Sequence, residues 1–546
     1  MTTNLNPRPG RALQLTELPW SNWVLLLATG VISLRPLTPT WNDNPNYSFG
    51  WLIPLVCLFF FIERWSARPL RQAAESIRFT IPLILWGVLF FAFRPAVETD
   101  PDWRPGLWVL VGLYVAALLG WLWTYGGVAW LRHFAFPVCF LFLSLPWFFE
   151  VEHPLVQGLM RWNAVLVASS LQLIGISAVP EGNLIQLQNC QLGVEEACSG
   201  ILSLQASLMM GCLLGEIYRL LPWNRIGLVV ASMGLALLGN YLRTLFLALM
   251  AFYSGPGAVT QWHDTAGYSI LVFTGVGSWL TALCLGRVKE PGVLAVDEQN
   301  LKSGALELAD HPVRGLNAQR FTIVIFSMAL FAEVCTQAWF VWRESALVRH
   351  PEWTVRWPAS ESLQEPALSD ITRTALRCDS AKIAQWKDGQ GWKWTSYWLR
   401  YDPKPYTRVV LGWHTPDNCL PTVGLTKDRD YPAFTTSVNG IEFYIEPKKF
   451  LSKESTIYLF WVVYPDSGGR PADTDTRISA PFATKFRTHL QDMWNGYRGV
   501  GVETLETAID GPPDYDAAKA GYLSLLRAAV VPGRGTEPDL MTGTSH

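Results

Sequence analysis

The sequence predicts an α-helical, multi-spanning membrane protein with about eight to ten apolar helices, followed by a soluble α+β domain. Half of the 546 residues are hydrophobic and only 16% are charged, which is well below the ~25% of soluble domains. The shortfall is uneven, because residues 20–286 are mostly apolar whereas residues 341–546 have an ordinary globular composition. The first dozen residues lack the apolar core of a cleaved signal, so we expect the spans themselves to direct insertion.

Apolar runs close to the length of a membrane span recur through the first two thirds of the chain. They fall at about 22–40, 47–63, 79–96, 108–127, 131–149, 155–177, 200–218, 226–254, 267–286 and 321–340. The loops "ERWSARPLRQAAESIR" and "RLLPWNR" are rich in arginine, whereas "WNDNPNY" and "VETDPDW" contain no Lys or Arg. The positive-inside rule therefore predicts a multi-pass protein of the cytoplasmic (inner) membrane with its N-terminus inside.

The run at 155–177 does not fit a simple alternation of spans. It carries Arg161 and Asn163 in its middle, and if it crossed the membrane, "RLLPWNR" would lie outside. We therefore predict an amphipathic helix in the outer interface or a shallow re-entrant element. A buried span with a paired arginine is the alternative.

The chain divides into four predicted regions. These are a transmembrane domain at 1–290, a polar cytoplasmic linker at 291–320, an additional transmembrane helix at 321–340 and an extracytoplasmic α+β domain at 341–546. In the last region, "STIYLFWVVYPD" alternates like a strand, and the Asn-Gly pair in "TTSVNGIEFYIEP" predicts a hairpin. An amphipathic helix is predicted by the four-residue recurrence of Phe482, Phe486, Leu490 and Trp494.

Cys198 lies where a predicted outer segment meets the span at 200–218, in the stretch "VEEACSGILSL". The unpaired amides at the start of a helix favour a thiolate. Glu195 and Glu196 oppose ionisation, so a nearby cation is needed if Cys198 is a nucleophile; Ser199 follows it directly. A cysteine packed as a small hydrophobic residue is the alternative.

Two further polar groups are predicted to face the same side. Asn240 and Arg243, in "GNYLRTLFL", lie one helical turn apart. Arg243 lies roughly 16 Å below the outer end of its helix, a depth at which an arginine needs a partner or a polar cavity. A structural ion pair with Glu216 is the alternative. His263 and Asp264, in "QWHDTAGY", are predicted in the outer loop before the next span.

Together these groups supply what acyl transfer requires. A thiolate attacks, a histidine transfers protons and a fixed cation stabilises the developing oxyanion. No histidine pair stands at metal-ligand spacing, the nine cysteines are scattered, and no Gly-rich loop indicates a nucleotide. We therefore expect no metal and no other cofactor. The net charge of −2 gives no indication of nucleic-acid binding.

These motifs resemble the exosortase/archaeosortase family of multi-spanning membrane proteins. The resemblance rests on "EGNLIQLQNCQLGVEEACSGILSL", "NYLR" and "HDTAGY", in the family's order and spacing over roughly residues 20–290. It implies a cysteine transpeptidase or protease acting on C-terminal sorting signals of exported proteins. Such signals combine a short motif such as Pro-Glu-Pro, a transmembrane helix and a basic tail. By this resemblance Cys198 is the nucleophile, Arg243 stabilises the transition state and His263 is the general acid/base.

The resemblance also implies supporting residues and one departure. Substrate-binding or supporting roles are expected for Glu195, Glu196, Ser199, Asn240 and Asp264, and the role of Asn240 could instead be structural. Many family members carry a basic residue two positions after the motif glycine, where this chain has Leu202. Any contribution of that arginine is therefore absent here or supplied by another residue.

A second resemblance concerns the C-terminal domain. "LGWHTPDNCLPTVGL" resembles the histidine-proline-cysteine signature of a periplasmic domain encoded beside, or fused to, exosortases in exopolysaccharide loci. His414 and Cys419 occupy its marked positions and are candidate functional residues. An ordered loop in which Cys419 forms a disulfide with Cys378 is the alternative.

The resulting hypothesis is a membrane cysteine transpeptidase/protease that acts through a thioester acyl-enzyme. Its expected partners are the lipid bilayer and membrane-anchored exported proteins with C-terminal sorting signals, with exopolysaccharide machinery as a further candidate. Two alternatives remain open at this stage. One is a non-catalytic component of exopolysaccharide assembly or export. The other is a membrane scaffold in which the C-terminal domain carries the function.

Overall fold

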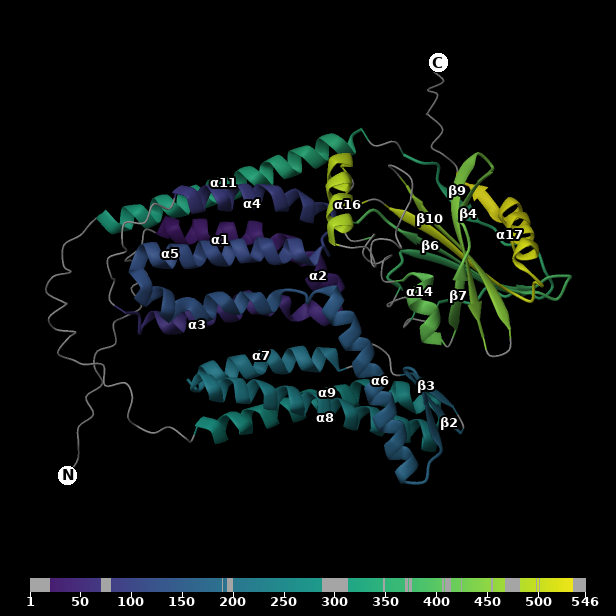
Figure 1. The fold of residues 1–546 in the computed structure, drawn as a ribbon, viewed down its shortest axis with the longest axis horizontal. Coiled ribbons are helices and arrows are strands. Elements are labelled where there is room, and N and C mark those ends of the chain that lie inside the picture. The colour runs from purple at the N-terminus through teal and green to yellow at the C-terminus, as the bar shows by residue number, and fades with distance from the viewer. Residues whose placement is uncertain are drawn as a thin grey trace, which may run out of the picture. The chain divides into compact units, whose positions relative to one another are not determined.

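The structure is a computed structural model of the 546-residue chain (Figure 1). It describes residues 20–69, 80–188, 190–193, 200–286, 313–346, 349–368, 372, 376–404, 407, 414–423, 425–452, 455–466, 482–496, 498–499 and 501–533. These residues belong to two compact units. The first unit falls within residues 1–40, 70–131 and 319–546, and the second within 41–69 and 132–318.

Helices, most of them long and apolar, make up most of the first 344 residues. They are α1 (Trp20–Leu34), α2 (Thr38–Asp43), α3 (Leu52–Trp65), α4 (Thr80–Thr99), α5 (Arg104–Cys139), α6 (Phe149–Leu173), α7 (Ile201–Ile217), α8 (Pro222–Ser254), α9 (Pro256–Gly286) and α11 (Val313–Glu344). Within the described ranges, seven stretches are long and apolar enough to cross a membrane: Trp20–Asp43, Asn46–Trp65, Thr80–Thr99, Arg104–Ser144, Pro222–Ser254, Gly257–Gly286 and Ala318–Glu344. A shorter apolar helix is α7. The predicted multi-spanning architecture is confirmed.

Helix α5 contains two of the predicted runs. Two helical segments meet in it at Gly127, the boundary between the runs expected at 108–127 and 131–149, and the second segment ends at Cys139. Gly127 has φ 74° and ψ −166°, a conformation that a residue with a Cβ rarely adopts. A single glycine, rather than a loop, therefore separates the two helical segments.

The turn between α8 and α9 corrects one prediction. Gly255, with φ 84°, ends α8, and Pro256 begins α9 directly. This is the usual placement of the two residues, because glycine tolerates the left-handed conformation after a helix and proline suits the first helical position. His263 and Asp264 therefore lie within a helix, and the predicted outer loop at this point is wrong.

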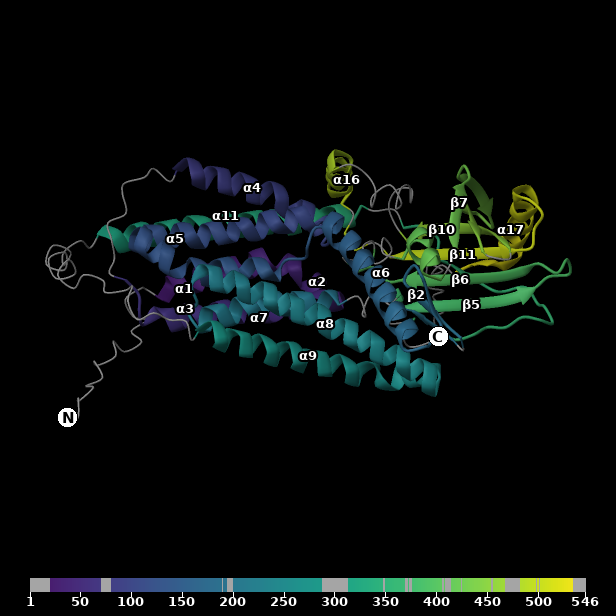
Figure 2. The same cartoon turned by 60° about the horizontal axis from the view of Figure 1, so that its bottom comes forward.

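In the second unit, α6 packs on the ends of other helices rather than in parallel with them. Figures 1 and 2 show it running at an angle to α7, α8 and α9. Its buried side chains share a core with the small antiparallel sheet of β1 (Ala178–Glu181), β2 (Leu184–Leu187) and β3 (Gln191–Gly193), and with the start of α7. Its placement in the membrane interface stays a prediction.

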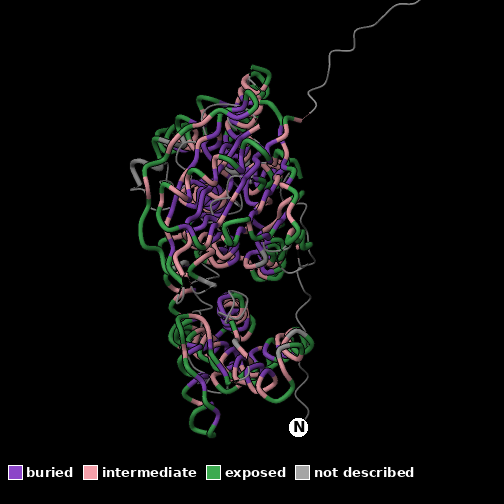
Figure 3. Tube along the Cα trace, turned by 90° about the vertical axis from the view of Figure 1, so that its right-hand side faces the viewer, coloured by how far each residue is buried: buried purple, intermediate pink, exposed green. Residues whose placement is uncertain are grey.

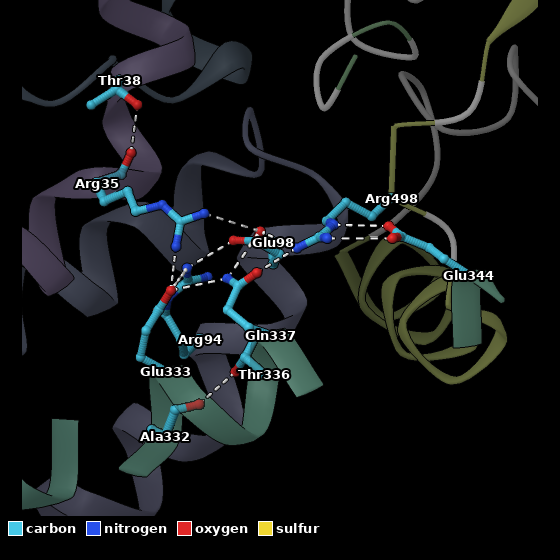
Figure 4. A network of polar contacts seen from close by, with 10 residues as sticks. All are labelled: Arg35, Thr38, Arg94, Glu98, Ala332, Glu333, Thr336, Gln337, Glu344 and Arg498. Carbon is cyan, nitrogen blue, oxygen red and sulfur yellow. Dashed lines mark hydrogen bonds and ion pairs between the residues drawn. The ribbon is translucent and has the colours of Figure 1, made fainter. Parts of the chain in front are cut away.

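In the first unit, a polar network joins α4 to α11 (Figure 4). The fully buried Arg94 donates from Nε to Oε2 of Glu333 at 2.6 Å, and its Nη2 lies 2.8 Å from Oε2 of Glu98. Gln337 donates to Glu333 at 2.9 Å, and Arg498 of the C-terminal domain donates to Glu98 at 2.9 Å. Buried charges are costly unless they are paired and hydrogen-bonded, and these side chains pair with one another.

The C-terminal region is built on one antiparallel sheet. Its strands are β5 (Ser380–Lys387), β6 (Lys393–Tyr401), β7 (Thr426–Asp430), β8 (Phe434–Val438), β9 (Ile441–Leu451), β10 (Thr456–Pro465) and β11 (Val502–Asp510), in the order β5-β6-β11-β10-β9-β7 with β8 paired to β9. The predicted hairpin is confirmed, since β8 and β9 are joined through Asn439 and Gly440, which have φ values of 52° and 82°. The α+β prediction is confirmed as well.

The two faces of this sheet have different coverings. On one face, helix α17 (Tyr515–Ala529) packs a core that includes Trp394, Phe460 and Tyr522, together with the short pair β4 (Trp353–Val355) and β12 (Val530–Pro532). The buried segments of this domain lie in its interior in Figure 3. On the other face, the segment of the short helix α14 (Pro416–Cys419) packs near Phe450, Leu459 and Trp461 through Leu420.

Candidate active site

Arg243 of α8 and His263 of α9 lie side by side in the second unit. Nη2 of Arg243 is 3.0 Å from Nε2 of His263 and 3.4 Å from its carbonyl oxygen. Arg243 also lies against Gly267, one turn further along α9, where a Cβ would be 3.6 Å from Nη2. Eleven residues separate Arg243 from the end of α8 at Ser254, so the guanidinium is attached roughly 16 Å along the helix from that end.

The partners of His263 define its tautomer. An arginine guanidinium only donates hydrogen bonds, so Nε2 of His263 accepts from Arg243. The imidazole is then neutral with its proton on Nδ1, which donates to Oδ1 of Asp264 at 3.1 Å. Arg243, His263 and Asp264 therefore form a chain of hydrogen bonds from the helical interior to an aspartate whose side chain is largely exposed.

Glu216 is not the partner of Arg243, and the predicted alternative of an ion pair between them is wrong. Oε2 of Glu216 lies 2.8 Å from Nη1 of Arg225, and Oε1 accepts from the guanidinium of Arg64. Glu216 lies at the end of α7 opposite to Gly200, whereas Arg243 lies in the later part of α8. Because its two oxygens already bind Arg64 and Arg225, Glu216 has a structural role in its own cluster.

Asn240 supports the segment that leads into α7. Gly200, which precedes the helix, has φ 83°, and a Cβ added there would lie 2.9 Å from Cγ and Nδ2 of Asn240. Both the backbone conformation and the close approach therefore require glycine at this position. Asn240 is buried, and its carbonyl oxygen accepts from Oγ1 of Thr244 at 3.0 Å. Thr244 in turn accepts from Nδ2 of the buried Asn163 on α6 at 2.7 Å.

The remaining predicted residues of this site lie outside the described residues. They are Glu195, Glu196, Cys198 and Ser199. The described residues nearest to them in sequence are Gly193 at the end of β3 and Gly200 before α7. Leu202, which replaces the basic residue of the family pattern, lies in the first turn of α7 and is partly exposed.

In the C-terminal domain, the structure brings the two predicted residues together. Sγ of Cys419 lies 3.8 Å from Nδ1 of His414, and the predicted alternative of a disulfide with Cys378 is not formed. Burial raises the pKa of the Cys419 thiol to about 11, and the negative charge of Glu506 adds to this shift. Burial also raises the pKa of Glu506 to about 7. At neutral pH this environment keeps Cys419 as a thiol, which limits its strength as a nucleophile.

Sequence reasoning missed several residues that the structure joins to these sites. Thr244 and Asn163 belong to the polar chain beneath Gly200, and the polar Asn163 in an apolar run had already been noted as unusual. The network of Arg94, Glu98 and Glu333 was also missed, although charged residues inside predicted spans are a recognisable signal. No group of three or more His, Cys, Asp or Glu residues suited to a metal ion occurs within the described ranges.

Comparison with protein families found a similarity in the membrane-helix region. Residues 41–280 match the family model described as Transmembrane exosortase (Exosortase_EpsH). The matched segment contains Asn240, Arg243 and His263 and ends before α11 and the C-terminal domain. Searches of curated proteins and of solved structures found no match. The chain is therefore a multi-pass membrane protein whose residues 41–280 are similar to the transmembrane exosortases.

Proposed function

We propose that this protein is a membrane-embedded cysteine transpeptidase or protease that cleaves C-terminal sorting signals of exported proteins. The observation that carries the proposal is the 3.0 Å contact between Arg243 and His263, one helical turn from the Asn240 side chain that packs against Gly200. Two peptide units separate Cys198 from Gly200, which limits the distance between their Cα atoms to about 7.6 Å. Gly200 packs against Asn240, one helical turn from Arg243, and the proposal requires the Cys198 thiol to reach Arg243 and His263.

The first half of the reaction forms a thioester. The thiol of Cys198 transfers its proton to Nε2 of His263, and the thiolate attacks the carbonyl carbon of the scissile peptide bond. The new C–S bond leaves a negative charge on the carbonyl oxygen, which the guanidinium of Arg243 stabilises by hydrogen bonds. Nε2 accepts a hydrogen bond from Arg243 in the structure, so Arg243 turns from His263 to the oxyanion as the proton arrives. Asp264 then stabilises the imidazolium through Nδ1.

The second half releases the products. The C–N bond breaks, and His263 returns its proton to the leaving amine, which remains on the membrane-anchored part of the substrate. Water or an amine acceptor then gives a proton to Nε2 of His263 as it attacks the thioester carbonyl. The C–S bond breaks, and the released Cys198 thiolate takes that proton back from His263, which restores the starting state without a cofactor.

The proposed reaction takes place at the outer face of the cytoplasmic membrane. The positive-inside distribution of arginines supports this orientation. Arg64 and Arg225, which bind Glu216, belong to two of the arginine-rich stretches and lie at the end of α3 and the start of α8. His263 lies near the start of α9, in the opposite part of the second unit's helices. A substrate helix anchored in the bilayer would present its scissile bond close to that outer part.

Processing of a reporter protein tests the proposal. A reporter carrying a Pro-Glu-Pro motif, an apolar span and a basic tail is co-expressed with the full chain, and its size and C-terminal mass are measured. We expect Cys198→Ala to abolish processing and Cys212→Ala, a change in α7 of the same membrane domain, to preserve it. Full processing by Cys198→Ala would refute the mechanism. The mass of the new C-terminus distinguishes hydrolysis from transfer to an amine.

A further inference from the structure

Helix α16 (Phe482–Asn495) has an apolar flank that stays partly exposed, although its two ends also contact tryptophans of the protein. At 100° per residue, Phe486, Leu490 and Trp494 share one flank. Their side chains are 36%, 39% and 66% exposed. Asp492, on the opposite side, is buried, and the carbonyl of Met493 accepts from Nε1 of Trp339 at 2.9 Å. The exposed apolar flank is therefore available for a contact outside the chain.

The helix lies at the ends of membrane-length helices of its own unit. The ring of Phe486 is 5.9 Å from that of Trp103, which directly precedes α5, and the ring of Trp494 is 5.5 Å from that of Trp339 near the end of α11. Tryptophans at the ends of spans mark the level of the lipid headgroups. These two contacts therefore place both ends of the apolar flank at the membrane–water interface.

The apolar flank is continuous with the exposed surface of α11. Val341 and Trp342 are more than half exposed, and the guanidinium of Arg343 lies 5.8 Å from the ring centroids of both Trp339 and Trp342. An arginine over aromatic rings at the end of a span is typical of an interfacial anchor. The exposed Arg487 lies beside the apolar flank of α16 and adds a positive charge suited to phosphate headgroups.

The length and direction of α16 distinguish an interfacial helix from a span. Its 14 residues extend about 21 Å, which is shorter than the ~30 Å hydrocarbon core. Figure 1 shows α16 running across the ends of α4 and α11 rather than along them. Its C-terminal end is held in place, because Gly496 packs against the Arg343 side chain and Arg498 enters the network of Glu98 and Glu344.

We propose that α16 lies in the plane of the membrane interface, with Phe486, Leu490 and Trp494 in contact with phospholipid. The partner of this surface is the bilayer that surrounds α4 and α11, since the flank continues their exposed apolar surface. The C-terminal domain is then a membrane-surface domain, held against the lipid by this helix and not only by the chain connection to α11. This inference does not depend on the proposed catalytic function.

Photocrosslinking of the full chain in phospholipid nanodiscs tests the contact. The photoreactive residue p-benzoylphenylalanine replaces Leu490 in one variant and the exposed, more polar-facing Gln491 in a matched control. A third variant carries it at Val334, which is 57% exposed in the middle of α11 and reports contact with lipid. After irradiation, intact-protein mass spectrometry measures the fraction of protein that carries a phospholipid adduct.

We expect lipid adducts at positions 490 and 334 in similar yield, and at least a fivefold lower yield at 491. If position 334 forms adducts and position 490 does not, the proposal is wrong. A crosslink from position 490 to another protein would also overturn it and would identify the flank as a protein-binding surface. If the Leu490 variant is not monodisperse, Phe486 offers a second position on the same flank for the same comparison.

Discussion

Arg498 and Glu98 are separated by 400 residues of sequence, yet Nη1 of the arginine donates to Oε1 of the glutamate at 2.9 Å. The same guanidinium also donates to Oε1 of Gln337 at 2.6 Å and to Oε1 of Glu344 at 2.9 Å. One side chain of the C-terminal domain thus binds acceptors on two membrane-length helices, α4 and α11 (Figure 4). The domain is attached to the helices by a shared charge network as well as by the chain.

Replacing Arg498 with alanine is expected to destabilise this attachment. The change leaves Glu344 without its cation, while Glu98 keeps its pair with Arg94, so the expected loss is at most about 3 kcal/mol. The matched control is Arg429→Ala, because Arg429 is 62% exposed and its pair with Asp428 contributes at most about 1 kcal/mol. Thermal unfolding of the full chain in detergent measures both changes. Equal effects of the two substitutions would contradict a special role for Arg498.

Gly200→Ala is expected to reduce processing by more than tenfold. The substitution forces a left-handed backbone on alanine, at about 1–2 kcal/mol, and drives its Cβ against Asn240. Gly234→Ala in α8 is the control, since a Cβ there meets no atom within 4 Å. The reporter assay measures processing, and immunoblotting measures the amount of each variant in the membrane. Normal processing by Gly200→Ala would show that this close contact does not matter.

Processing is expected to fall in both Asn163→Leu and Thr244→Val, and the losses of the two single variants are not expected to add in the double variant. Each removes one end of the 2.7 Å hydrogen bond that connects α6 to the helix of Arg243. Because residues in one hydrogen-bond network are coupled, the double variant should lose less than the sum of the two single losses. A double-mutant cycle on processing rate measures the coupling. Full additivity would indicate that the two residues act separately.

The stability of the C-terminal domain is expected to fall as the pH rises from about 4.5 to about 7. Burial raises the pKa of Glu506 from 4.5 to about 7, so in this interval the folded state holds a proton that the unfolded state has lost. Glu506→Gln removes the contribution of this carboxyl and should stabilise the protein at pH 8 by at most about 3 kcal/mol, with no gain at pH 4.5. The contribution of Glu503 remains, because burial raises its pKa to about 7 as well. Glu442→Gln, at an exposed position of β9, is the control. Thermal unfolding at both pH values provides the measurement.

Cys419 is expected to react slowly with iodoacetamide. A pKa of about 11 rather than 9.0 lowers the thiolate fraction at pH 7.5 roughly 100-fold. Because the charge of Glu506 contributes to this shift, Glu506→Gln should increase the alkylation rate. Mass spectrometry of peptides after timed alkylation measures the rate at this residue. Rapid alkylation of Cys419 in the unchanged protein would contradict the buried environment described here.

Much of the fold could be predicted because its signals are local. Hydropathy predicts the spans, and the Asn439–Gly440 pair predicts its hairpin because its φ values suit few other residues. Helix ends were less predictable. The polar residues His263 and Asp264 indicated a loop, but they lie in the first turns of α9. The helix begins earlier, at Pro256, because Gly255 completes the turn directly before it.

The site was only partly predictable, because side-chain pairing depends on the tertiary fold. A mid-span arginine needs a partner, but the sequence offered Glu216 as a candidate for Arg243 and did not indicate the contact with His263. The choice follows from helix register, which places Glu216 beside Arg64 and Arg225 instead. The hydrogen bond from Asn163 to Thr244 also joins elements far apart in sequence, so no local pattern could predict it.

Helix α8 makes polar side-chain contacts with its neighbours at two positions along its axis. Arg225 near its start pairs with Glu216 of α7, and Arg243 pairs with His263 of α9. Eighteen residues separate the two arginines, a distance of about 27 Å along the axis. Sliding of α8 along its length would break both pairs at once, whereas rotation of Arg243 about its own side-chain bonds breaks only one. Admission of a substrate helix is therefore expected to move side chains and neighbouring helices around α8, which itself serves as the fixed axis of the site.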